Sequence, residues 1–183
     1  MAAWSRALAG AVVFSVPGWP ILTVADVAEA AQPSAVCHIE VHNTADPGLW
    51  ATEPTEGTIT SRAGTIVCIG ALDGQQLSPD PGTFALRWSY GGEGSGLGGS
   101  NCISGRVTGS WDVTLPMADG TTMALTGPTT SEWAGTVFRV GGQFGRHAVD
   151  GIGQVRLDPD HLDEDCVTKP VRHWIDTVQV AVS

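Results

Sequence analysis

Hydrophobic and polar residues alternate with a period of two along most of the chain beyond residue 35. In the segment 83–90, one face carries Phe84, Leu86, Trp88 and Tyr90, and the other carries polar or small residues. The segment 103–115 alternates in the same way, with Ile103, Val107, Trp111, Val113 and Leu115 on one face. This period is typical of β-strands with one buried face.

The pattern predicts about eight strands, at 36–43, 57–70, 83–90, 103–115, 121–126, 132–140, 143–157 and 171–182. Gly, Asp and Pro residues that suit turns separate them, at 46–48, 72–74, 79–82, 119–120 and 140–142. Glycines inside the strands favour sharp bends or bulges. We therefore expect an all-β fold, an antiparallel meander that closes into a small β-barrel, with a β-sandwich as the alternative.

The first 30 residues have the three parts of a secretory signal peptide. Arg6 precedes the apolar run 7–16, and the small residues at 28–30 suit a signal peptidase. No apolar run reaches the ~20 residues that span a bilayer, so we expect no transmembrane anchor. The sequence predicts a signal peptide at 1–30, a single β domain at 31–183, and a secreted, extracellular protein.

Four cysteines follow the predicted signal peptide, at Cys37, Cys68, Cys102 and Cys166. An even number in an exported chain predicts two disulfides, and three connectivities remain open. The spacings lack the close pairs of a zinc site, and a catalytic thiol would be oxidised in this compartment.

The net charge of -10 disfavours nucleic acid as a partner, because the chain's nine Lys and Arg residues are too few and scattered for phosphate contacts. We expect a monomer that binds a small ligand or a glycan.

The stretch 94–99 matches G-x-G-x-x-G, but it leads into a predicted strand instead of the helix that a dinucleotide site requires. We interpret it as a hairpin loop, which could act as a lid over a barrel mouth, and we expect no cofactor.

A resemblance to a known group of proteins rests on two further stretches, SGRVTGSWDVTLP at 104–116 and DEDCVTKPVRH at 163–173. From Trp88 to its end, the chain resembles small secreted actinobacterial proteins, mostly uncharacterised. In these proteins, a Gly-rich β-domain ends with an Asp-Cys-Val-Thr-x-Pro-Val segment before a final strand. The resemblance implies export and a disulfide at Cys166, and it supplies no catalytic residue.

The candidate ligand-binding residues lie mainly on polar strand faces. His38, Glu40 and His42 alternate along one strand, where neighbours in this series lie ~7 Å apart. They would line a cavity if the polar face of a barrel pointed inward, and otherwise form a solvated face. Arg87 and Arg106 belong to comparable polar faces, and Trp50 follows a turn where it could stack on a sugar.

The densest charge lies at 158–165, where Asp158, Asp160 and Asp163 are weak candidates for a calcium site. The order of an EF-hand is absent, and an acidic surface turn is the simpler interpretation. We expect no metal. The sequence favours an exported β-barrel that binds a small molecule, a glycan or a cell-envelope partner. A small barrel enzyme of the cyclase or isomerase type and a structural surface protein are the alternatives.

Overall fold

The computed structural model describes residues 34–91 and 99–183, and all of them belong to the second of the two units into which the chain divides, Ala31–Ser183. The predicted signal peptide and the glycines at 92–98, with the proposed lid, lie outside the described residues. Within the described residues, no helix is long and apolar enough to cross a membrane.

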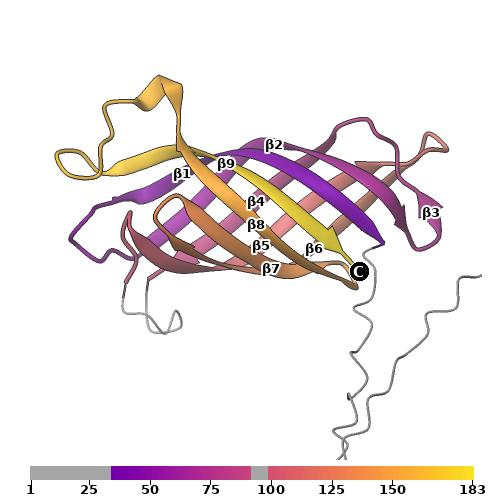
Figure 1. Cartoon of the computed structure of the whole chain (residues 1–183), viewed down its shortest axis with the longest axis horizontal. Coiled ribbons are helices and arrows are strands. Elements are labelled where there is room, and N and C mark those ends of the chain that lie inside the picture. Colours follow the sequence, from indigo (N-terminus) through magenta and orange to yellow (C-terminus); the bar gives the residue numbers. More distant parts are fainter. Residues whose placement is uncertain (1–33, 92–98) are drawn as a thin grey trace, which may run out of the picture. The chain divides into compact units, whose positions relative to one another are not determined.

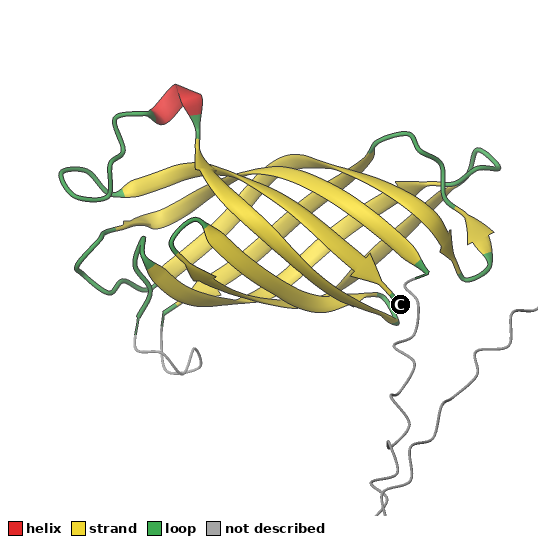
Figure 2. Ribbon diagram, in the orientation of Figure 1, coloured by secondary structure: helices red, strands yellow, loops and turns green. Residues whose placement is uncertain are grey.

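The fold is a closed antiparallel β-barrel of eight strands, as the alternation predicts (Figures 1 and 2). The strands are β1 (Ala35–Leu49), β2 (Gly57–Leu72), β4 (Gly82–Tyr90), β5 (Ser104–Pro116), β6 (Thr122–Ala134), β7 (Val137–Phe144), β8 (His147–Leu157) and β9 (Val171–Val182). Each strand pairs with the next, and β9 pairs with β1 to close the ring. The short β3 (Gln75–Gln76) pairs with β2 outside the ring, and a 3-10 turn, η2 (Pro159–His161), follows β8.

Apolar side chains fill one half of the barrel. Trp111 lies between Phe84 and Phe144, with ring centroids 5.9 and 4.7 Å apart. The Trp111 indole N–H donates to the carbonyl of Gln143 at 2.6 Å. These three rings form an aromatic layer across the lumen, which we call the floor. The inward positions predicted for 83–90 and for 107–115 are confirmed, because Trp88, Tyr90 and Val107 are buried with their neighbours on the same faces. Ile103, predicted on the same face, is instead exposed, because it precedes β5.

The predicted turn at 140–142 is wrong, since these residues lie inside β7. Gly142 is needed for close packing: a Cβ there would lie 2.9 Å from the Trp111 ring. The predicted break between 126 and 132 is also absent, because β6 continues through Pro128. Pro128 lies just beyond the β6–β7 pairing, which begins at Thr129, so its missing N–H does not interrupt that ladder.

The turns in this region fall instead at two other glycines. Gly135 and Gly145 have positive φ values of 62° and 59°, which glycine adopts without steric cost. They form the β6–β7 and β7–β8 turns. The segment 46–48, expected as a turn, lies within β1, where the pairing with β9 is irregular between Thr44 and Leu49.

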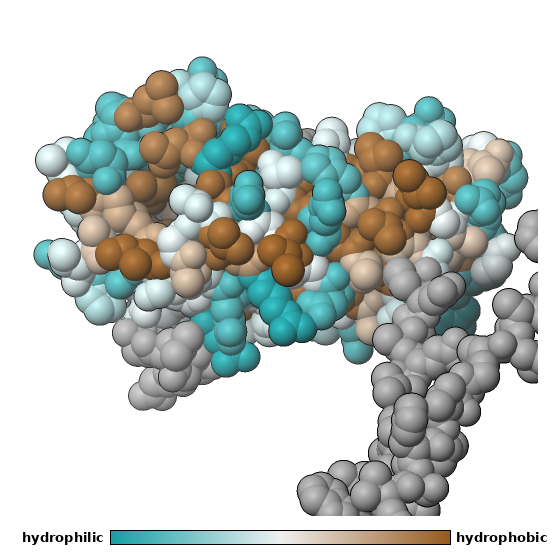
Figure 3. All heavy atoms as spheres, viewed as in Figure 1, coloured by the Kyte–Doolittle hydropathy of each residue, from teal (hydrophilic) through white to brown (hydrophobic). Residues whose placement is uncertain are grey.

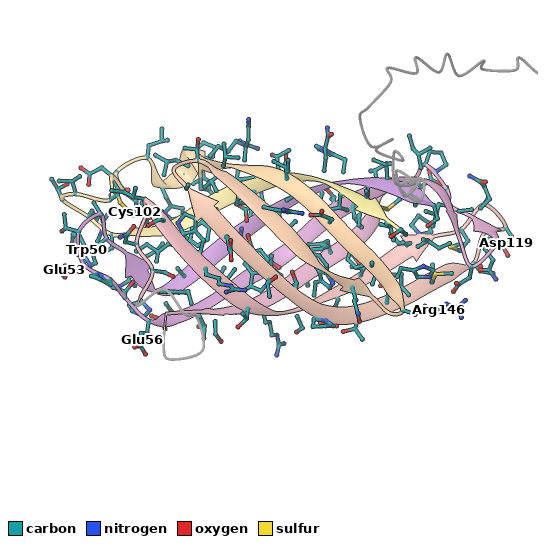
Figure 4. All side chains as sticks on the ribbon, turned by 60° about the horizontal axis from the view of Figure 1, so that its bottom comes forward. Trp50, Glu53, Glu56, Cys102, Asp119 and Arg146 are labelled. Atoms are coloured by element: carbon teal, nitrogen blue, oxygen red, sulfur yellow. A yellow bond between two sulfur atoms is a disulfide. The ribbon has the colours of Figure 1, made fainter. Side chains whose placement is uncertain are left out.

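The two predicted disulfides are present and connect Cys37 with Cys68 and Cys102 with Cys166. The first joins directly opposed residues of β1 and β2 inside the barrel. The second joins the segment before β5 to the segment before β9, at the end of the barrel where β1, β4, β6 and β8 end. We call this the cavity end. Figure 4 shows Trp50 and Cys102 at this end, with Asp119 and Arg146 at the other.

Candidate functional site

A cavity of about 360 Å³ occupies the barrel between the floor and the cavity end. Its wall is mostly apolar and includes four aromatic side chains, Trp88, Trp133, Phe138 and Trp174. Aliphatic side chains complete it, among them Leu49, Ile59, Val107 and Val155. The volume is within the usual range for small-molecule sites, which are concave, mostly apolar and supplied with a few polar groups.

Two aromatic rings of the wall lie flat over glycines of the neighbouring strand. Trp133 is opposite Gly105 on β5, and a Cβ at Gly105 would approach the Trp133 ring to 2.1 Å. Phe138 is likewise opposite Gly153 on β8, where a Cβ would come within 2.2 Å of the ring. The glycines let both rings lie against the sheet, and this leaves the centre of the lumen open.

One carboxyl group lies within this apolar wall. Asp176 is an inward-facing residue of β9, in the alternating series with Trp174 and Val178, and is only 3% exposed. The side-chain amide of Asn43, on β1, donates to Asp176 Oδ2 at 2.7 Å. Burial raises the pKa of Asp176 from 3.8 to about 7, and the Asn43 amide and the Trp174 indole offset only part of that rise.

Two polar atoms of cavity residues have no hydrogen-bond partner among the described residues. These are Asp176 Oδ1 and the indole N–H of Trp88, which belongs to β4. Leaving a buried polar group without a partner costs about 1–3 kcal/mol. A bound molecule that accepts from Trp88 and donates to Asp176 would remove both penalties.

The rim of the cavity is formed by the segment between β8 and β9, which carries Glu164, Asp165 and Cys166. Glu164 is buried, and its Oε2 accepts hydrogen bonds from the backbone N–H groups of Arg172 and His173, at 2.7 and 2.8 Å. Its Oε1 contacts His173 Nδ1 at 2.8 Å. Burial raises the pKa of Glu164, but the hydrogen bonds outweigh burial and hold this pKa below its usual value.

Asp165 fixes the next turn of the rim. Its Oδ1 accepts from the backbone N–H groups of Val167, Thr168 and Lys169, at 3.0, 2.7 and 3.1 Å. The Thr168 hydroxyl and these N–H groups hold the pKa of Asp165 well below its usual value. Together with the Cys102–Cys166 disulfide, this turn fixes the rim segment to the barrel.

The candidate residues on the polar strand faces lie outside the barrel. His38, Glu40 and His42 alternate with the buried inward residues of β1, so the hypothesis that their face lines the cavity is wrong. Glu40 Oε2 lies 3.4 Å from Arg156. The physical reason is that the apolar alternate residues Cys37, Ile39 and Val41 fill the lumen, as hydrophobic burial requires.

The two arginine candidates also point outward. Arg87 is exposed on β4, and Arg106 on β5 pairs with Glu132 at 3.3 Å. Trp50 is half-buried just after β1, and its carbonyl accepts the backbone N–H of Cys102 at 3.0 Å. On the face of the barrel that Figure 3 presents, apolar and polar side chains are interspersed.

The three acidic metal candidates are not brought together as one site. Asp158 caps η2 through the N–H of Asp160 and contacts His42 Nδ1 at 3.2 Å. Asp163 pairs with Lys169, and Asp160 is exposed. Within residues 34–91 and 99–183, the cluster with metal-ligand spacing consists of His161, Glu164 and His173, and it contains none of the three aspartates.

The sequence interpretation therefore missed both polar features of the cavity end. Asp176 could have been noticed as the charged residue between Trp174 and Val178 in the inward series of β9. The second feature has a sequence signal in the H-x-x-E spacing of His161 and Glu164, with His173 following on the next strand.

The chain matches no protein-family model, no curated protein and no solved structure. The function must therefore be argued from the geometry of the cavity and its rim.

Proposed function

We propose that this protein is a β-barrel binding protein that holds a small apolar molecule in the cavity. The observation that carries the proposal is the cavity itself, about 360 Å³ of largely apolar lumen above a packed floor. A folded barrel of this size can be filled completely by side chains. The open half is therefore better explained by a ligand than by a purely structural role.

The lining also indicates the chemistry of the ligand. The apolar walls favour a molecule with an apolar body over a glycan, whose hydroxyl groups would need many hydrogen-bond partners. Asp176 and Trp88 supply the unpartnered polar atoms. The best fit is an apolar molecule with one polar end that both donates and accepts a hydrogen bond.

The test is a titration with N-phenyl-1-naphthylamine, a neutral apolar dye that carries one N–H group and emits strongly in apolar surroundings. We expect saturable binding of one dye per chain, with energy transfer from the cavity tryptophans. The double variant Val107→Phe/Val155→Phe adds two rings to the wall on β5 and β8. It should abolish this binding.

The matched control is Thr108→Phe/Gln154→Phe, which adds the same rings to the adjacent, outward-facing positions of the same strands. This control should bind the dye as the unmodified protein does. Equal dye binding by both double variants would place the dye outside the cavity and refute the proposal.

The alternative is a small cavity enzyme of the cyclase or isomerase type, and Asp176 is the observation that favours it. A carboxyl group with a pKa near 7 inside an apolar cavity suits proton transfer at neutral pH. It could take a proton from a carbon beside a carbonyl and return it elsewhere on the same molecule. Conversion of a β,γ-unsaturated ketone to its conjugated isomer, lost in Asp176→Asn, would favour the enzyme. Binding without conversion would favour the binding protein.

We also propose that the protein is exported. Its two disulfides are compatible with an oxidising compartment. N-terminal sequencing of protein from the culture medium should find a chain beginning near residue 31, whereas full-length chain retained in the cytoplasm would contradict export.

A further inference from the structure

His161, Glu164 and His173 meet at the rim of the cavity end, on the outside of the barrel. His161 is the last residue of η2, Glu164 follows three residues later, and His173 is on β9. One side-chain nitrogen or oxygen from each of the three lies within 4.8 Å of the others. We call this group the His–Glu–His cluster. The cluster is separate from the polar atoms of Asp176 and Trp88 that the cavity offers to its ligand, although Glu164 also belongs to the cavity rim.

The carboxylate of the cluster is oriented in advance. The backbone N–H groups of Arg172 and His173 both donate to Glu164 Oε2. Oε1 is left to face the two imidazoles, at 2.8 Å from His173 Nδ1 and 3.9 Å from His161 Nδ1. Hydrogen bonds that fix a ligand carboxylate in this way are typical of metal sites, where they set its orientation and basicity.

The two imidazoles are stacked face to face. The rings of His161 and His173 stack with centroids 3.8 Å apart and planes 18° from parallel. Their Nδ1 atoms both lie near the same carboxylate oxygen. Both side chains are partly exposed, so an ion bound here could keep a solvent-facing position.

The surrounding charge also favours a cation. Asp158 and Asp163 lie on the same segment as the cluster, and Asp158 interacts electrostatically with His161. Lys169 pairs with Asp163, and its charge reaches Glu164 only as a weaker interaction at longer range. The Cys102–Cys166 disulfide holds the rim segment two residues beyond Glu164. The position of Glu164 relative to the two histidines is therefore restrained by a covalent bond.

We propose that the His–Glu–His cluster binds a divalent transition-metal ion of the zinc class. Two imidazole nitrogens and one carboxylate oxygen form the ligand set found in open zinc sites, with water in the fourth position. Ca²⁺ and Mg²⁺ prefer oxygen ligands and would bind poorly. Because the in-plane lone pairs of two nearly parallel rings do not converge on one point, one imidazole must turn out of the stack to bind the ion. The ion then replaces the hydrogen bond between His173 Nδ1 and Glu164 Oε1, while Oε2 stays on the backbone.

The experiment is calorimetric titration of the purified, oxidised chain with Zn²⁺ after treatment with a chelator, at neutral to slightly alkaline pH. We expect one ion per chain and a higher melting temperature with Zn²⁺ than with Ca²⁺ or Mg²⁺ at the same concentration. Co²⁺ should give the visible absorption of a four-coordinate site. Absence of saturable Zn²⁺ binding would refute the proposal.

The informative variant is His161→Ala, because within the described residues the His161 side chain makes no hydrogen bond and contacts only the His173 ring and, at 3.9 Å, Glu164. It should fold normally and lose at least about tenfold in zinc affinity. His38→Ala is the matched control, since it removes an exposed histidine from the outer face of β1, and its zinc affinity should be unchanged. Equal affinity in His161→Ala and the unmodified protein would place the ion elsewhere and overturn the assignment.

Discussion

The side-chain amide of Asn43 and the carboxyl group of Asp176 form a buried hydrogen bond of 2.7 Å between the first and last strands of the barrel. The bond crosses the β1–β9 junction that closes the ring. It leaves Asp176 Oδ1 without a partner among the described residues. The same pair of residues therefore bridges the strands that close the barrel and supplies a polar group to the cavity.

Asp176 should make the free energy of unfolding fall as the pH rises from about 4 to about 7. Its folded-state pKa, about 7, is above the unfolded value near 3.8, so the folded protein binds the extra proton in this window. The difference of about three pKa units corresponds to roughly 4 kcal/mol, an upper estimate. Asp176→Asn should remove this dependence and be the more stable protein at pH 8.

The measurement is chemical denaturation of both proteins at pH 5 and pH 8. Other titrating groups, histidines included, are common to the two chains, so the difference between them isolates Asp176. Parallel pH profiles would show that Asp176 does not carry the raised pKa.

The two disulfides should separate stability from ligand binding. Their sequence separations of 31 and 64 residues predict losses of about 4 kcal/mol each from chain entropy when both cysteines of a pair become serine. Only the Cys102–Cys166 pair lines the cavity. Its removal should also weaken dye binding, whereas the Cys37–Cys68 variant should bind dye normally while it remains folded. Dye titrations below each variant's unfolding midpoint would check this, and equal weakening by both would contradict it.

Gly105→Ala should displace the Trp133 ring. The new Cβ would lie 2.1 Å from that ring, and Trp133 would lose its hydrogen bond to the carbonyl of Asn101, now 3.0 Å long. We expect a loss of about 1–3 kcal/mol in stability, because the core is overpacked locally. Because Trp133 lines the cavity, displacement of its ring should also change the affinity for the dye. Gly120→Ala is a useful comparison: nothing lies within 4 Å of its Cβ, although its φ of +85° adds backbone strain. It should leave dye affinity unchanged.

Trp111→Phe should cost more stability than Trp174→Phe. Trp111 is buried between two rings of the floor and donates a hydrogen bond to Gln143, so its loss leaves a gap and an unpaired carbonyl. Roughly 2–3 kcal/mol is expected. Trp174 faces a cavity that is already open. Thermal unfolding of the two variants tests the order, and the reverse order would contradict the description of the floor.

Much of the barrel could be predicted from the sequence, because its strands follow the period of two with few exceptions. The inward faces with Trp88 and Trp111 and the antiparallel meander follow from this pattern. The presence of two disulfides, though not their connectivity, follows from the even number of cysteines. The turns between residues 122 and 157 could not be placed, because glycines and a proline occur inside strands there for packing reasons. Gly142 makes room for the Trp111 ring, and Pro128 lies past the end of a ladder.

The site was less accessible to sequence analysis, because it depends on which side of each strand faces the lumen and on which strands meet. The hydrophilic face of β1, with His38 and His42, attracts attention in the sequence but lies outside. Asp176 reaches Asn43 only because β9 returns to β1, at a separation of 133 residues. Likewise, His161 and His173 stack only once the rim segment folds back at Cys166.

Glu164 belongs both to the lining of the cavity and to the His–Glu–His cluster. The two proposed sites thus share a side chain, which gives a physical route by which occupancy of one would change the affinity of the other. If zinc changes the affinity for the apolar ligand by some factor, the ligand must change the affinity for zinc by the same factor. A barrel with these two sites would respond to metal availability as well as to its ligand.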